Sequence, residues 1–181
     1  MADYATEGQQ TRAYAAYYGL WIGLIWTVSF ALAVYGLRHP FASSLAPLVG
    51  LASFPIAATL LKGFRDHVAG KLPLRRSWHM SWMMMLGAAL ITTFAQYIYF
   101  AYIDGGNFVM AYSEIIAQPE THDIIAQMLP DQDVDALANE ALTTFAATPP
   151  SQIALQFLFW NTLLATISAL PIALTAKSRG I

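Results

Sequence analysis

Residues 13–37 read AYAAYYGLWIGLIWTVSFALAVYGL, and this stretch decides the fold. It runs for 25 residues between Arg12 and Arg38 without a charged side chain. A helix needs about 20 apolar residues to cross a hydrocarbon core of about 30 Å. The stretch therefore predicts a membrane-spanning helix over about 14–37.

A cleaved signal peptide is the competing interpretation, since Ala31, Leu32 and Ala33 imitate a cleavage site. The apolar part of a signal peptide is only about 7–15 residues long, however, and its leader is basic. Here the leader carries Asp3 and Glu7 as well as Arg12. We therefore expect a retained span.

Three further windows lack charged residues: 23 residues between Arg38 and Lys62, 27 between Arg76 and Asp104, and 36 between Glu140 and Lys177. Pro149 and Pro150 shorten the last window, because proline is disfavoured inside helices. The windows predict spans over about 41–61, 78–103 and 152–176. Apolar residues make up 57% of the chain and charged residues 11%, against about 25% charged in soluble domains.

These windows predict an all-α polytopic membrane protein. We expect one membrane domain over 1–181, a four-transmembrane-helix bundle with an extracytoplasmic helical insertion between spans three and four. The runs do not alternate polar and apolar residues as a barrel requires. Alternating the spans places eight basic residues on one side of the membrane: Arg12, Lys62, Arg65, Lys71, Arg75, Arg76, Lys177 and Arg179. The other side holds only Arg38, so we expect a multi-pass protein of the bacterial inner (cytoplasmic) membrane with both termini cytoplasmic.

Polar side chains inside the spans are few. Gln96 on the third span and Gln156 and Asn161 on the fourth are the candidate intramembrane contacts. An unpaired amide is costly in hydrocarbon, so we expect hydrogen bonds between helices, each worth about 0.6–2 kcal/mol. No Asp, Glu, Lys or Arg lies at mid-membrane depth, which argues against a pump or an ion-coupled carrier.

Small residues and prolines shape the first two spans. Gly19 and Gly23 have the spacing that permits close helix approach. The second span is rich in Ala and Ser and contains Pro47 and Pro55. Packing against neighbouring helices is one interpretation of this span, and a broken helix that lines a substrate site is the alternative.

No pattern predicts a metal, a cofactor or catalysis. His79 and the nearby methionines do not form a ligand set, because consecutive residues point in different directions around a helix. Asp131-x-Asp133-x-Asp135 resembles the start of a calcium loop, but Ala136 stands where glycine is needed, so helix capping explains it better. No nucleophile triad, phosphate loop or dinucleotide fingerprint is present, and we expect neither an enzyme nor a nucleic-acid partner.

Residues 104–150 contain eight acidic residues and no Lys or Arg: Asp104, Glu114, Glu120, Asp123, Asp131, Asp133, Asp135 and Glu140. Three apolar stripes at helical spacing predict amphipathic helices that pack on one another and on the ends of the spans, with the acidic residues outward. The stripes lie around Phe108–Ile116, Ile124–Leu129 and Val134–Phe145. In the last stripe we expect Val134, Leu137 and Leu142 to be buried, and Asp133, Asp135 and Glu140 to be exposed.

The loop between spans two and three carries five basic residues: Lys62, Arg65, Lys71, Arg75 and Arg76. They are candidate contacts for anionic lipid of the inner leaflet, where each basic group contributes about 1 kcal/mol. The alternative is that these charges serve only to set the orientation of the spans.

One block carries a family resemblance. It begins with Lys62-Gly63-Phe64-Arg65-Asp66 and ends with Tyr97-Ile98-Tyr99-Phe100-Ala101-Tyr102-Ile103-Asp104. The chain resembles a family of small four-span inner-membrane proteins, frequent in the Bacteroidota, known only as a domain of unknown function. Members often continue Ile-Asp with Pro, where this chain has Gly105-Gly106. The resemblance implies the four-span fold and transfers no catalytic residue.

Two functional hypotheses follow. The leading one is a non-enzymatic scaffold or accessory subunit that binds a protein partner, or a second copy of itself, through residues 104–150. The alternative is a small carrier or channel, as a homo-oligomer, with a polar site between spans two, three and four. A membrane-embedded enzyme ranks third, because no nucleophile, base or metal set is visible.

Overall fold

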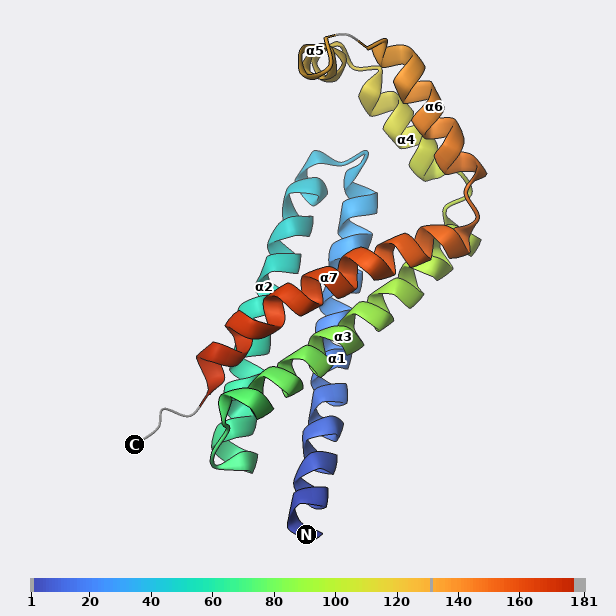
Figure 1. Ribbon diagram of the computed structural model, residues 1–181. Coiled ribbons are helices and arrows are strands. Elements are labelled where there is room, and N and C mark those ends of the chain that lie inside the picture. Colours follow the sequence, from blue (N-terminus) through green and yellow to red (C-terminus); the bar gives the residue numbers. More distant parts are fainter. Residues whose placement is uncertain (1, 131, 178–181) are drawn as a thin grey trace.

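The computed structural model describes residues 2–130 and 132–177, with side chains from residue 7 onward (Figure 1). Asp131 and Arg179, which entered the sequence argument, lie outside the described residues. All regular elements in the described ranges are helices: α1 (Ala2–Gly36), α2 (Pro40–Phe64), η1 (Arg65–Ala69), α3 (Leu74–Ile98), η2 (Tyr99–Ile103), α4 (Asn107–Ile116), α5 (Pro119–Met128), α6 (Val134–Ala147) and α7 (Pro150–Ala176).

Four helical segments are long and apolar enough to cross a membrane: Glu7–Gly36, Pro40–Ala69, Leu74–Ile103 and Pro150–Ala176. The all-α prediction with four such helices is therefore confirmed. The helices extend beyond the predicted spans, since α1 begins at Ala2 and the second helix continues past Lys62 to Ala69. Charged residues mark where the hydrocarbon ends, whereas a helix continues into the polar interface where long basic side chains reach water.

Prolines lie at the start of four helices in the described ranges. Pro40, Pro119 and Pro150 are the first residues of α2, α5 and α7, and Pro73 immediately precedes α3. The first helical position has no intrahelical use for its N–H, and the fixed φ of proline suits it. For the same reason α7 begins at Pro150, and the fourth span is shorter than its charge-free window.

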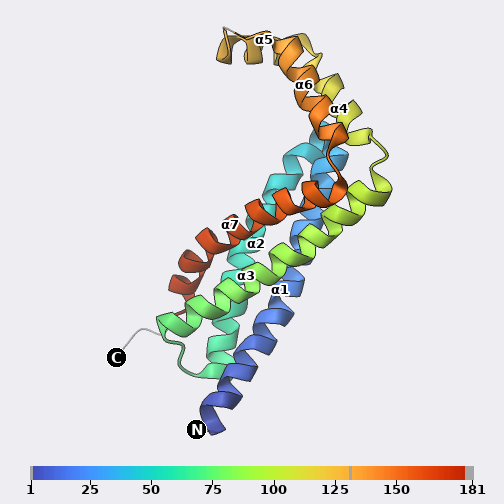
Figure 2. The same cartoon turned by 45° about the vertical axis from the view of Figure 1, so that its right-hand side comes forward.

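The four long helices pack side by side, with α1 against α2 and α3, and α3 against α7 (Figures 1 and 2). Helices α2 and α7 lie close at one end and diverge towards the other. We call the end that carries α4–α6 the arm end and the opposite end the basic end. Helix α1 begins and α7 finishes at the basic end.

Small residues allow these close approaches. A Cβ added at Gly19 would lie 2.7 Å from the carbonyl oxygen of Met84, and one added at Gly23 would lie 2.9 Å from Ile91 Cβ. The glycine pair therefore marks a close contact between α1 and α3. On α2 the residues that face the neighbouring helices are mostly small: Ala42, Ala46, Ser53 and Ala57 are buried. This burial favours the packing interpretation of that helix.

Methionines fill the centre of the helical core. Met80, Met84 and Met85 are fully buried among Ile22, Leu61 and Phe64. The thioether side chain is flexible and fills irregular gaps. These methionines therefore have a packing role.

Helices α4, α5 and α6 form what we call the arm, over residues 104–149. Helices α4 and α6 run side by side, and α5 lies across the tip (Figures 1 and 2). Asp133 caps α6, because its Oδ1 accepts hydrogen bonds from the backbone N–H groups of Asp135 (3.0 Å) and Ala136 (3.1 Å). The capping prediction is thus confirmed for Asp133.

The prediction that all three arm stripes are packed is wrong for α5. Of the three α6 residues expected to be buried, Val134 is buried, whereas Leu137 and Leu142 are only half-buried. On α5, however, Ile124 is 56% and Met128 76% exposed. The helix is only ten residues long and starts at Pro119, so the chain turns across the tip and little of the apolar face of α5 meets α4 or α6.

Candidate functional site

The junction between the spans and the arm is built around Asp104. Expected to face outward, this side chain is instead 7% exposed. Its carboxylate accepts hydrogen bonds from the Tyr99 hydroxyl (2.8 Å) and from the backbone N–H groups of Gly106 (3.1 Å) and Phe108 (2.9 Å). The aspartate therefore satisfies donors at the start of α4, where the helix dipole also favours a negative charge.

The turn after Asp104 needs its two glycines. Gly105 and Gly106 have φ values of +53° and +85°, in the left-handed region that side chains with a Cβ rarely adopt. A proline at the first of these positions would require φ near −65°. A proline at position 105 would therefore not fit this turn.

Aromatic rings attach the base of the arm to the spans. Phe100 on η2 lies 5.4 Å from Phe108 of α4, 5.9 Å from Phe145 of α6 and 5.9 Å from Phe157 of α7, measured between ring centroids. Phe108 and Phe145 stack on each other at 5.0 Å. Such pairs contribute about 0.5–1.5 kcal/mol each beyond their buried area. The Phe100 ring on η2 therefore joins α4 and α6 of the arm to the spans, and it also contacts α7.

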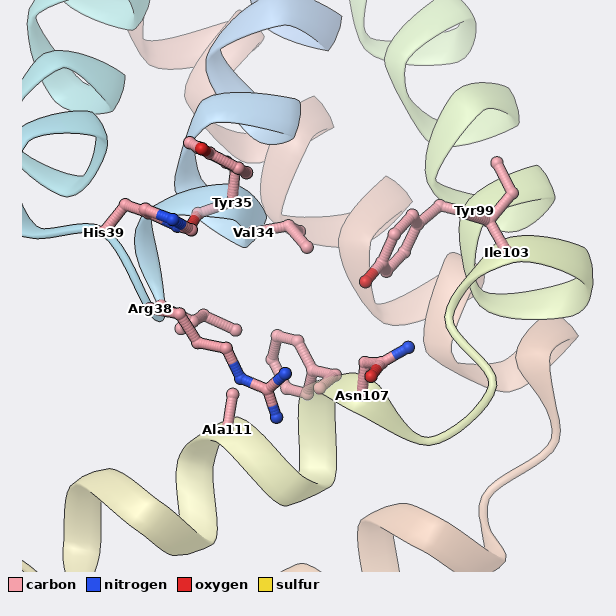
Figure 3. A pocket seen from close by; sticks show the side chains of 10 residues that line it. Val34, Tyr35, Arg38, His39, Tyr99, Ile103, Asn107 and Ala111 are labelled. Atoms are coloured by element: carbon pink, nitrogen blue, oxygen red, sulfur yellow. The ribbon is translucent and has the colours of Figure 1, made fainter.

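A pocket of about 240 Å³ lies beside this junction, between the end of α1, the turn at 37–39, η2 and α4 (Figure 3). Figure 3 shows Arg38 reaching towards α4 next to Ala111. Its Nη2 lies 3.4 Å from Glu114 Oε1, with the side chains 48% and 63% exposed. An ion pair this exposed is worth about 0–1 kcal/mol. The pocket therefore lies at the junction between the spans and the arm. The contacts that hold this junction together are those of Asp104 and the aromatic rings.

The acidic residues of the arm do face outward where the structure describes them, apart from Asp104. Glu114, Glu120, Asp123, Asp133, Asp135 and Glu140 are exposed. Asp135 Oδ1 lies 3.5 Å from His122 Nε2 across the α5–α6 contact. The exposed apolar residues Ile124, Met128 and Leu129 lie at the same tip. The tip thus combines negative charge with an uncovered apolar face.

A second candidate site is a groove of about 600 Å³ between α1, α2, α3 and α7, where α2 and α7 diverge. The structure brings Gln96 and Asn161 together on its wall, with Asn161 Nδ2 donating to Gln96 Oε1 at 3.1 Å and to Thr93 Oγ1 at 3.3 Å. Pro47 also lines the groove. Gln156 does not join the pair, because it lies on the exposed face of α7.

The five basic residues of the 62–77 segment divide into two groups. Arg65 donates to Asp66 (2.7 Å) and to the carbonyl of Ala176 at the end of α7 (3.1 Å). Arg76 donates to Glu7 (2.9 Å) and to Thr11 (3.1 Å). Lys62, Lys71 and Arg75 are exposed and have no ion pair among the described residues. Only these three remain free to contact lipid headgroups.

Several polar contacts were not predicted from the sequence, among them those of Asp104 and Trp26. Asp104 was expected among the exposed acidic residues, although Asp followed by Gly-Gly at the start of a helical stripe is a capping signal. The buried hydrogen bond from Trp26 Nε1 to Ser53 Oγ (2.8 Å) joins α1 to α2. No spacing in the sequence indicates that second pair, because the partners lie on different helices.

A family comparison matches residues 17–178 to the family described as "Protein of unknown function (DUF4199)". Neither the curated proteins nor the solved structures contain a match to the chain. The matched residues take in almost all of the four candidate spans, the whole arm, the Asp104 junction and the groove. The chain therefore belongs to the DUF4199 family, whose function is unknown.

Proposed function

We propose that this protein is a non-enzymatic membrane scaffold or accessory subunit that presents the arm on the extracytoplasmic side of the bacterial cytoplasmic membrane. The orientation is supported by charge. Arg12, Lys62, Lys71, Arg75 and Lys177 are exposed at the basic end. Among the described residues Arg38, which pairs with Glu114, is the only Lys or Arg at the arm end. Cytoplasmic loops carry such an excess of basic residues, so both termini are cytoplasmic in this proposal.

The main support for this proposal is that the base of the arm is fixed to the spans while its tip exposes apolar residues. The base is tied down by the Asp104 hydrogen bonds and by the Phe100 rings. The tip exposes Ile124 and Met128 beside acidic side chains. A rigid base limits the entropy lost when the tip binds, and burying an apolar face gains about 25 cal/mol per Å². The partner that fits is a protein segment with apolar residues flanked by Lys or Arg.

Site-specific photo-crosslinking tests this role in the intact membrane protein. A photoreactive residue at Met128 is expected to crosslink to a single partner, while one at Gln127, also on α5, serves as the control. The crosslink should weaken at high salt, because the acidic tip attracts a basic segment. Ile124→Asp should abolish it. Equal crosslinking from both positions, or crosslinks to lipid alone, would contradict the proposal, and a crosslink between two copies would identify self-association.

The groove favours a second candidate, a small carrier or channel acting as a homo-oligomer. Gln96, Asn161 and Pro47 all line it. A transport path would need polar groups to continue towards the basic end, where the core contains Met80, Met84 and Met85. Solute uptake into liposomes that carry the purified protein separates this candidate from the scaffold, which should leave the liposomes as tight as protein-free ones.

A further inference from the structure

The wall of the groove holds polar atoms that the protein itself does not satisfy. Gln96 is 4% exposed, and its Oε1 accepts the hydrogen bond from Asn161 Nδ2. Among the described residues no partner is found for Gln96 Nε2 or for Asn161 Oδ1. An amide group left unpaired away from water costs about 1–3 kcal/mol. The pair therefore offers one donor and one acceptor to whatever occupies the groove.

The remaining lining restricts the chemistry of that occupant. No acidic, basic or histidine side chain lines the groove, so a charged group would be desolvated without compensation. Five aromatic rings line it instead: Trp26, Phe30, Phe54, Phe157 and Trp160. A volume of about 600 Å³ with few polar groups falls in the range of small-molecule sites. These features favour a neutral molecule with a planar ring.

The position of the groove indicates how a molecule enters. Helices α2 and α7 converge at the basic end, where Arg65 of the second helix reaches the last turn of α7, and they diverge towards the arm end. The groove therefore opens sideways, between two helices that each have the length and hydropathy of a membrane span. A ligand would arrive from within the bilayer, which requires an apolar body.

We infer that this groove binds a neutral lipophilic molecule that carries a carbonyl group on a planar ring, with Gln96 Nε2 donating a hydrogen bond to the carbonyl oxygen. The aromatic side chains pack on the ring, and the apolar remainder of the molecule extends between α2 and α7. A bulk acyl chain fills the same space without satisfying the amide atoms. This inference is independent of the scaffold role of the arm, since the arm does not line the groove.

Equilibrium binding to the full-length protein in phosphatidylcholine nanodiscs tests the inference. The probe is a tritiated decyl-substituted benzoquinone, and empty nanodiscs measure its partition into lipid. Unlabelled quinone should displace the probe, whereas decylbenzene, which lacks the carbonyl groups, should compete roughly tenfold less well because the hydrogen bond is absent. Equal competition by decylbenzene would mean that the groove takes apolar molecules without selection and would overturn the inference.

Three variants distinguish binding in the groove from nonspecific binding to the protein or the lipid. Ala33→Phe places a ring in the groove and should abolish saturable binding without touching the amides. Gln96→Leu combined with Asn161→Leu removes both amides together and should weaken binding roughly tenfold. Gln156→Leu is the matched control, an amide lost from α7 outside the groove, and should bind as the wild type does. Wild-type binding by both groove variants would show that only bulk lipid fills the site.

Discussion

At the scale of single residues, Asp104 connects two parts of the molecule. Its carboxylate accepts one hydrogen bond from a side chain of η2 and two from the backbone at the start of α4. A carboxylate held this way at a helix N-terminus needs no basic partner, because N–H groups and the helix dipole stabilise its charge. Asp104 therefore helps to fix the orientation of the arm, together with the aromatic rings around Phe100.

Replacement of Asp104 by Ala should lower the free energy of unfolding by about 1–3 kcal/mol, because the partly buried N–H groups of Gly106 and Phe108 lose their acceptor. Denaturant unfolding in detergent micelles measures this change, and hydrogen exchange should show the amides of α4 losing protection first. Asp123→Ala, at an exposed position of α5, is the control and should stay within about 0.5 kcal/mol of the wild type. Equal stability of the two variants would contradict the capping role.

At the scale of elements, close backbone approach decides how α1 meets α3. The added Cβ at Gly19 would meet a backbone carbonyl oxygen, which cannot rotate away as a side chain can. By contrast, nothing lies within 4 Å of a Cβ added at Gly63, which is also helical. Packing against α3 therefore requires glycine at position 19, whereas no packing contact requires glycine at position 63.

These two glycines should respond to alanine with opposite signs. Gly19→Ala should destabilise the protein by about 1–3 kcal/mol, because α1 and α3 must separate. Gly63→Ala should stabilise it by up to about 1 kcal/mol, since alanine loses less backbone entropy in a helix. Both changes are read as shifts of the unfolding transition in the same detergent. A stabilising Gly19→Ala would show that α1 does not pack closely on α3.

At the scale of the whole molecule, charge distribution predicts the topology. The chain has no cysteine, so single cysteines report position without background. A cysteine at Ser113 in the arm should react with an impermeant thiol reagent added outside intact spheroplasts. A cysteine at Lys71 at the basic end should react only after lysis. Labelling of both from outside would contradict cytoplasmic termini.

The basic end should show two separate effects of charge removal. Replacing Lys62, Lys71 and Arg75 by Gln should reduce co-purifying anionic lipid, because each free basic group near the surface contributes about 1 kcal/mol. Arg76→Gln should instead lower stability by about 1–3 kcal/mol, since Glu7 and Thr11 lose their partner. Lipid analysis by mass spectrometry and thermal unfolding measure the two effects. Unchanged lipid content in the triple variant would leave only the orientation role of these charges.

The sequence alone determined the features that depend on neighbours along the chain. Charge-free windows indicated four candidate spans, because backbone groups in hydrocarbon must be satisfied within a helix of sufficient length. Pro149-Pro150 marked the start of α7, and periodic stripes indicated the helices of the arm. Each of these signals acts within a few turns, so no knowledge of the partner helix was needed.

Only the tertiary structure decided which side chains meet across helices. Gln96 accepts a hydrogen bond from Asn161, while Gln156 lies on the exposed face of α7. Arg65 and Arg76 donate hydrogen bonds to other helices, while the side chain of Lys71 is exposed. Such pairs are separated by tens of residues, and they form only when two helices have the right rotation and crossing. The rotation and crossing of two helices depend on close packing at contacts such as those of Gly19 and Gly23, and therefore on the neighbouring helices.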